Sequence, residues 1–79
     1  MLSASISRQE LFEGIVEASA WDNNSITELV FNTVEREVIP IFMDSMGESL
    51  IDYSCERLKL RGTIFGGYLH VTSFSFIKQ

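Results

Sequence analysis

The sequence predicts an α+β fold, with two to three N-terminal helices followed by a C-terminal antiparallel β-hairpin, in one small domain over residues 1–79. Three observations predict it. Serine is followed three residues later by glutamate at three places, which is the spacing of a helix capping box. Apolar residues recur at helical spacing before Pro40, and they alternate with polar residues after Glu56, as in a strand. A chain of this length forms one domain at most.

The first helix is expected over about residues 8–20. Its capping box is formed by Ser7 and Glu10, and Ile6 is placed to form a hydrophobic staple. The apolar stripe that follows consists of Leu11, Phe12, Ile15, Val16 and Ala20. Residues 21–24 then form a turn, because Asp and Asn bond their own backbone and tolerate the left-handed conformation.

A second helix is expected after this turn, with Ser25 and Glu28 as its capping box. Its apolar stripe consists of Ile26, Leu29, Val30, Thr33, Val34 and Val38. Pro40 ends or kinks this helix, because a residue before proline is pushed out of the α region. The short apolar stretch at residues 40–44 is then a connector or a single turn.

A third helix is expected from Ser45, which pairs with Glu48 as a capping box, although Gly47 weakens the first turn. Two interpretations of residues 46–61 stay open. In one, the helix ends near Glu56 and a strand follows. In the other, the helix continues to the end of this range, and the glycine at position 62 terminates it.

The C-terminal hairpin is predicted from two runs of strand-forming residues that flank Gly66 and Gly67. Two consecutive glycines suit a type I′ turn, because both central residues need positive φ. An isolated hairpin is marginally stable in water, so it needs the helices or a second copy of the chain. We therefore predict a homodimer formed by sheet extension.

A two-residue turn fixes which residues face each other across the hairpin. The predicted pairs are Phe65 with Tyr68, Thr63 with His70, Arg61 with Thr72, Lys59 with Phe74, and Arg57 with Phe76. All these side chains would share one face, and the other face would be the core. The predicted core face consists of Leu58, Leu60, Ile64, Leu69, Val71 and Ile77. A single bulge would swap the faces beyond it.

The exposed face of this hairpin is the predicted partner-binding surface. It consists of Arg57, Lys59, Arg61, Phe65, Tyr68, His70, Phe74 and Phe76. Aromatic residues with arginine are good anchors for a protein partner. The same mixture also occurs on sheets that stack bases and hold phosphates. Plain cross-strand packing, with cationic stems lying across rings, is the structural alternative.

Charge is distributed unevenly along the chain, whose net charge is −5. Residues 1–56 carry all 11 acidic residues against two arginines, and residues 57–79 carry four basic residues and no acid. The acidic part weighs against nucleic acid as the partner, because phosphate attraction supplies most non-specific affinity. It suits a basic protein partner, although solvated helix faces explain the same carboxylates.

Catalytic and metal chemistry find little support in the sequence. The chain has one cysteine, Cys55, and one histidine, His70, so no intramolecular disulfide forms and a structural zinc site lacks ligands. As a nucleophile–base pair, these two residues would lack a third group to orient the histidine. We expect the Cys55 thiol to be buried, as is usual for a free cysteine. We predict no catalytic residues, no metal and no cofactor.

The first ten residues lack the basic and apolar regions of a signal peptide, and no run approaches the roughly 18 apolar residues that cross a bilayer. With a single cysteine, this predicts a cytoplasmic protein of the producing or host cell, without a membrane partner.

Together these features predict a non-enzymatic interaction protein that binds and modulates another protein. A phage-encoded inhibitor, an immunity protein or an antitoxin-like regulator has this size and acidity. The alternative is a nucleic-acid-binding regulator that uses the basic and aromatic face of the C-terminal hairpin.

Overall fold

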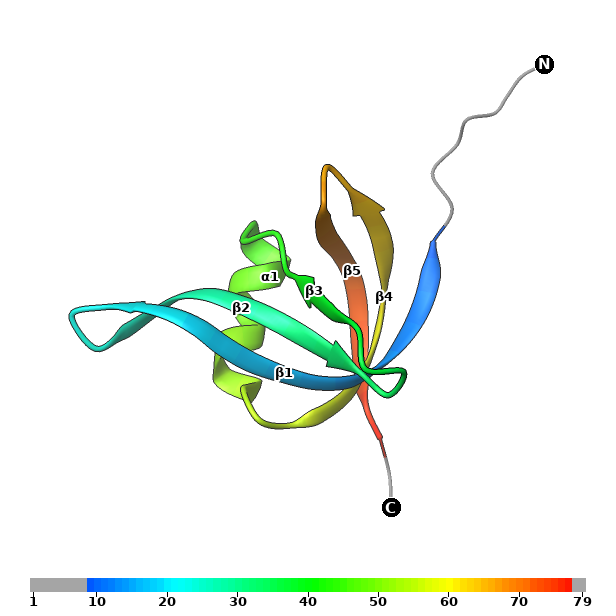
Figure 1. Ribbon diagram of the computed structural model, residues 1–79, viewed down its shortest axis with the longest axis horizontal. Helices are drawn as coiled ribbons and strands as arrows, with labels where there is room; N and C mark the ends of the chain where they lie inside the picture. Colours follow the sequence, from blue (N-terminus) through cyan, green and yellow to red (C-terminus); the bar gives the residue numbers. More distant parts are fainter. Residues whose placement is uncertain (1–8, 78–79) are drawn as a thin grey trace.

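The first half of the chain forms strands where helices are predicted, as shown by a computed structural model that describes residues 9–77. β1 (Glu10–Asp22) and β2 (Ser25–Thr33) pair as a long antiparallel hairpin that projects from the rest of the molecule (Figure 1). Asn23 and Asn24 form the turn with φ values of 52° and 71°, the positive values that a type I′ turn needs. The predicted turn is confirmed, and the helices on both sides of it are wrong.

Burial in β2 follows the period of a strand. Leu29 and Phe31 are both buried, and residues two apart share one face of a strand but not one side of a helix. The predicted helical stripe leaves out Phe31, which is fully buried, and includes Val34, which is 56% exposed. The side chains that fill the core thus require an extended backbone here.

The helical part of the protein is short and lies between β3 (Val38–Pro40) and the C-terminal hairpin. α1 (Ser45–Ser49) continues directly as one turn of 3₁₀ helix, η1 (Leu50–Tyr53). Its N-cap is Asp44, whose carboxylate accepts a hydrogen bond of 2.9 Å from the Gly47 N–H. The predicted start of this helix is therefore correct within one residue.

The predicted fold class is wrong, because residues 9–77 form five strands and one short helical segment in place of two to three helices and a hairpin. Of the other predicted capping boxes, the pair Ser25 and Glu28 lies on exposed positions of β2. In the first box Glu10 begins β1, while Ser7 and the staple residue Ile6 lie outside the described residues. Glu10, Ser25 and Glu28 are exposed residues of strands, where the same spacing carries no capping role.

The C-terminal hairpin is confirmed. β4 (Arg57–Phe65) and β5 (Tyr68–Phe76) pair in antiparallel fashion, and Gly66 and Gly67 form the turn with φ values of 63° and 84°. The open question about residues 46–61 is resolved in favour of a helix followed by a strand, because the helical turns stop before β4 begins.

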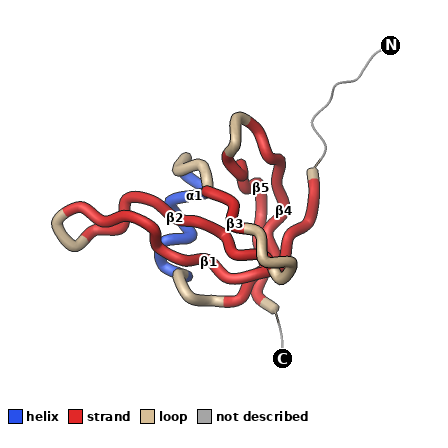
Figure 2. The backbone as a smooth tube through the Cα atoms, viewed as in Figure 1, coloured by secondary structure: helices blue, strands red, loops and turns tan. Residues whose placement is uncertain are grey.

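The five strands form one sheet in the order β3-β2-β1-β4-β5. β1 is central, since its first part pairs with β4 and its second part pairs with β2. The strands curve strongly (Figure 2), and the ends of the sheet meet where Ile41, just after β3, forms a parallel bridge with Leu69 of β5. This path, with a helix between β3 and β4, has the connectivity of an OB-fold, a partly open Greek-key barrel. Connectivity alone does not define a function, which must be argued from side chains.

The core lies inside the curved sheet and receives residues from every strand and from η1. It consists of Val16, Leu29, Phe31, Ile39, Ile41, Leu50, Leu58, Leu60, Leu69 and Val71. The predicted core face of the hairpin is confirmed for Leu58, Leu60, Leu69 and Val71. Ile64 was also predicted to be buried, but it lies next to the turn and is 49% exposed. The curved sheet leaves this end of β4 uncovered.

Candidate functional site

The predicted hairpin register holds near the turn and fails beyond it. Phe65 pairs with Tyr68 and Thr63 pairs with His70, as predicted. The register then shifts by one residue, because Thr72 is an extra residue on β5 and forms a bulge. The Thr72 hydroxyl donates a hydrogen bond of 3.0 Å to the carbonyl oxygen of Arg61 and holds the bulge in place.

Beyond the bulge, the predicted pairs of Arg61 with Thr72, Lys59 with Phe74, and Arg57 with Phe76 are wrong. Phe74 pairs with Leu60 and Phe76 pairs with Leu58, two leucines of the core. Paired residues point to the same side of a sheet, so these phenylalanines turn away from the cationic side chains. The predicted partner-binding surface is thus divided into separate parts.

The cationic part is a row on the outer side of β4. Arg57, Lys59 and Arg61 are all exposed, and their neighbours on β5 include Ser73 and Ser75 rather than aromatic residues. On the other side of β4 these cations lie beside β1. A row of cations without interleaved aromatic rings lacks the base-stacking partners of a single-strand binding surface.

The second part, here the C-terminal aromatic group, consists of Tyr53, Phe74 and Phe76. The Tyr53 ring centroid lies 5.4 Å from that of Phe74 and 5.2 Å from that of Phe76. Tyr53 and Phe74 are half-buried and pack against the core. This group therefore attaches η1 to the end of β5.

The third part, here the turn aromatic group, consists of Phe42, Phe65, Tyr68 and His70. The Phe42 ring stacks on the His70 ring, with centroids 4.4 Å apart, and its centroid lies 6.2 Å from that of Tyr68. Phe65 is 73% exposed, and its ring forms a T-shaped contact with the His70 ring, with centroids 5.8 Å apart. Three of these residues were predicted from the hairpin, and Phe42 was missed because it lies in the segment interpreted as a connector.

The tertiary structure holds Phe42 in this group from two sides. Its N–H donates a hydrogen bond of 2.9 Å to the carbonyl oxygen of Leu69 in β5. Its own carbonyl oxygen faces Gly47 of α1, where a Cβ atom would lie only 2.0 Å away. Only glycine fits this close approach, so the helix start and β5 together fix the position of Phe42.

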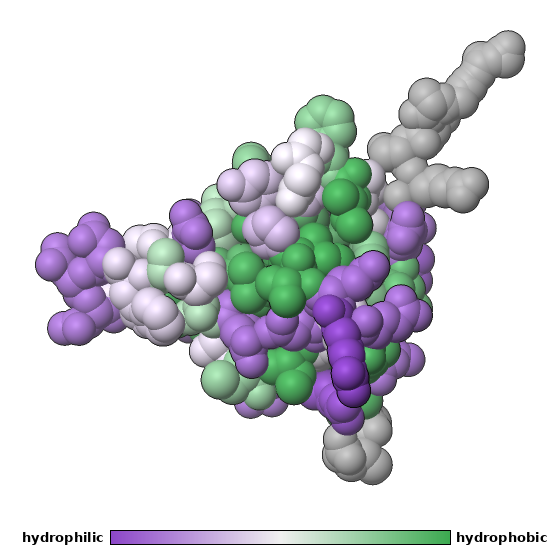
Figure 3. Space-filling model, viewed as in Figure 1, coloured by the Kyte–Doolittle hydropathy of each residue, from purple (hydrophilic) through white to green (hydrophobic). Residues whose placement is uncertain are grey.

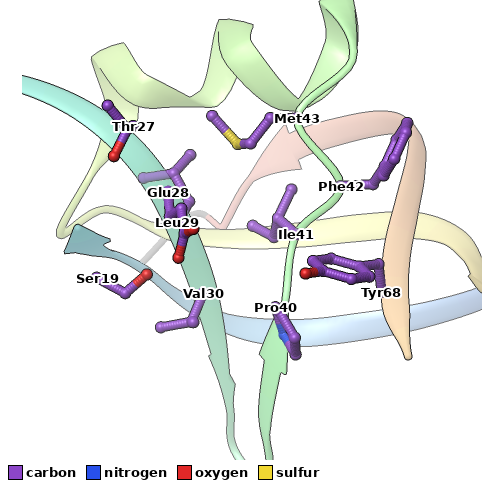
Figure 4. Close-up of a pocket in the computed structure, with 10 residues that line it drawn as sticks. All are labelled: Ser19, Thr27, Glu28, Leu29, Val30, Pro40, Ile41, Phe42, Met43 and Tyr68. Carbon is purple, nitrogen blue, oxygen red and sulfur yellow. The ribbon is translucent and has the colours of Figure 1, made fainter. Parts of the chain in front are cut away.

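A hollow of about 450 Å³ opens beside the turn aromatic group. It is lined by Ser19, Thr27, Glu28, Leu29, Val30, Pro40, Ile41, Phe42, Met43 and Tyr68. Figure 4 shows Tyr68 reaching across toward Ile41 with its hydroxyl end foremost. Figure 3 shows hydrophobic surface between the β1–β2 hairpin and the β4–β5 turn, bordered by hydrophilic residues. The hollow is mainly apolar, and among the described residues that line it Glu28 is the one that carries a charge.

The remaining candidates are a hollow bordered by carboxylates and one exposed thiol. A second hollow of about 410 Å³ contains Glu10, Glu13, Glu35 and Glu37. Within residues 9–77, no cluster of His, Cys, Asp and Glu is arranged to hold a metal ion. Cys55 is exposed in the loop before β4, so the predicted burial of this thiol is wrong. In the same part of the chain, no helix has the length and apolar character that crossing a membrane requires.

No protein-family model, curated protein or solved structure matches this chain. The function is therefore argued from the side chains of the turn aromatic group and the hollow beside it.

Proposed function

We propose that this chain is a non-enzymatic binding module that holds another protein against the turn aromatic group and the neighbouring hollow. One observation carries the proposal: four rings form a contiguous group at the surface, and two of them, Phe42 and Tyr68, line an open, mainly apolar hollow of about 450 Å³. Concave apolar sites with a few polar groups are the usual places where proteins bind ligands and anchor residues.

The exposure of these rings supports a protein partner. Phe42, Phe65 and Tyr68 are 42%, 73% and 47% exposed, although they lie together. Clustered apolar surface is unfavourable in water and is characteristic of interaction sites. Tyrosine and other aromatic residues, held rigidly, supply much of the binding energy in protein interfaces.

Modulation of the partner's activity and a cytoplasmic site of action are part of this proposal. A single cysteine suits a reducing compartment. Association of two copies stays a prediction, and light scattering on the full chain at increasing concentration checks it.

The test uses the tagged full chain to capture partners from a lysate of its source cells, with nuclease present. Affinity for the purified captured protein is then measured by biolayer interferometry. We expect Phe65→Ala and Tyr68→Ala each to weaken binding at least about tenfold, because they remove exposed anchors. Phe76→Ala is the matched control, since Phe76 is a similarly exposed ring (53%) in the other aromatic group, and its effect should stay below about threefold. Equal losses in all three variants would contradict the proposal.

Single-stranded nucleic acid is the second candidate, and one observation favours it. The hollow lies on β2, on the segment at the end of β3 and beside the β4–β5 turn, where proteins with OB-fold connectivity bind oligonucleotides. Against it, the described residues that line the hollow include no cation, and the chain has a net charge of −5. Fluorescence anisotropy with labelled oligonucleotides at low and high salt distinguishes the two. Tight, salt-sensitive binding that Tyr68→Ala abolishes would favour nucleic acid.

A further inference from the structure

We infer that the hollow accepts a lysine or arginine side chain of the partner protein, with its charge beside Glu28 and its stem along Tyr68 and Phe42. This inference rests on the proposed function, because it names the chemistry of the partner group at the same site. Three features of the hollow carry it: the sign of its charge, its aromatic rings and the apolar character of its walls.

Charge is the first feature. Glu28 is the one charged residue among the ten that line the hollow. The surrounding hairpin adds to the negative potential, since β1 and β2 contain five acidic residues and no lysine, arginine or histidine. A group of opposite charge is the complementary occupant, and its attraction also increases the rate of encounter.

The desolvation of Glu28 argues for a cation over a purely apolar group. Glu28 is exposed in the free protein, so water hydrates its carboxylate. An apolar occupant would displace this water without replacing its hydrogen bonds, which is unfavourable. An ammonium or guanidinium group replaces them with charge-assisted hydrogen bonds.

The rings and walls suit the rest of such a side chain. Phe42 and Tyr68 contribute aromatic rings, whose faces attract a cation held within about 6 Å. Val30, Pro40 and Met43 contribute apolar surface, on which the methylene stem of lysine or arginine packs. A short acidic side chain or a phosphate would meet the carboxylate of Glu28 with like charge.

A second copy of this chain is the competing source of a cation, because Arg57, Lys59 and Arg61 form an exposed row on β4. A contact between this row and the hollow joins two different surfaces, so it would generate rings or open filaments. The inference therefore commits to a different protein as the source.

The experiment is a titration of the ¹⁵N-labelled full chain by NMR with three short peptides. The probes are acetyl-Gly-Lys-Gly-amide, acetyl-Gly-Arg-Gly-amide and acetyl-Gly-norleucine-Gly-amide, which keeps the stem and lacks the charge. We expect saturable shifts of the backbone amides of Glu28, Phe42 and Tyr68 with the two cationic peptides. The norleucine peptide should bind at least about fivefold more weakly.

Two matched variants locate the effect. Glu28→Gln should weaken the cationic peptides at least about fivefold and leave norleucine unchanged, because it removes only the charge. Asp22→Asn makes the same chemical change at the hairpin tip, outside the hollow, and should change affinity less than twofold.

Several results would overturn the inference. These are equal binding of lysine and norleucine peptides, shifts confined to other residues, no saturable shift with any peptide, or stronger shifts of the same amides with a short oligothymidylate. Concentration-dependent self-association that Glu28→Gln abolishes would assign the site to a second copy. The proposed function fails separately, when Phe65→Ala and Tyr68→Ala leave the affinity for the captured protein unchanged.

Discussion

The turn aromatic group and the C-terminal aromatic group both take residues from β5, yet they lie in different surroundings. Phe74 of the C-terminal group is half-buried and packs against the core and Tyr53. Phe65 and Tyr68 of the turn group are exposed, and Tyr68 lines the open hollow. The bulge at Thr72 lies between the two groups and changes which side chains of β5 face the core. One extra residue thus separates aromatic side chains that stabilise the fold from aromatic side chains that are free to contact a partner.

The largest effect is expected from the double variant Phe74→Ser and Phe76→Ser, which places serines at the two inward positions beyond the bulge. The loss of both rings and the burial of a hydroxyl should remove most of the total stability of about 4–12 kcal/mol expected for a chain of this length. Deletion of Thr72 is the control, because Ser73 then follows Val71 opposite Arg61 and Phe74 stays opposite Leu60, so the inward face is kept and the loss should be smaller. Circular dichroism during thermal unfolding compares the two variants. A larger loss from deleting Thr72 than from the double variant would show that the inward rings are not the main source of stability at this end of β5.

A smaller effect is expected from truncating one ring in each aromatic group. Phe74→Ala should lower the free energy of unfolding by about 2–3 kcal/mol, because it leaves a cavity beside the core. Phe65→Ala should lower it by less than about 1 kcal/mol, because the ring is 73% exposed. Urea denaturation monitored by tryptophan fluorescence measures both values. Similar values for the two variants would remove the distinction between the groups.

Gly47→Ala should lower the free energy of unfolding by about 1–3 kcal/mol, and its distinguishing effect is on the position of one aromatic ring. The added methyl group meets the Phe42 carbonyl oxygen and displaces the one member of the turn group that does not come from the hairpin. Chemical shifts of Phe42, Tyr68 and His70 should change, while those of Phe76 should not. Glu48→Ala, at an exposed position of the same helix, is the control and should leave all of them unchanged. Wild-type shifts in Gly47→Ala would mean that α1 does not position Phe42.

The error in the first half of the sequence has a specific physical origin. Residues i and i+4 share one side of a helix and also one face of a strand, so Phe12 and Val16 fit both structures. The residues at i+2 distinguish the two, and in β1 this position is Gly14, which carries no side chain to reveal its burial. In β2 the distinguishing residue is Phe31, whose full burial the helical stripe does not explain.

The turn between β1 and β2 carried a second indication that the flanking segments are strands. Asn23 and Asn24 are consecutive residues that tolerate positive φ, and they lie between two apolar runs. That arrangement is typical of a two-residue hairpin turn. Gly66 and Gly67 form the equivalent turn between β4 and β5, where the strands were predicted correctly.

The sequence by itself determined several local features of this protein: both tight turns, the hairpin of β4 and β5, the start of the short helix within one residue, and the four hairpin residues Leu58, Leu60, Leu69 and Val71 that enter the core. Each depends on residues close together in the chain, whose backbone preferences and spacing can be read directly. Only the tertiary structure decided the bulge at Thr72 and the meeting of Phe42 with Tyr68 and His70. These depend on closure of the curved sheet between Ile41 and Leu69, a contact between distant residues that forms when the core of all five strands is packed.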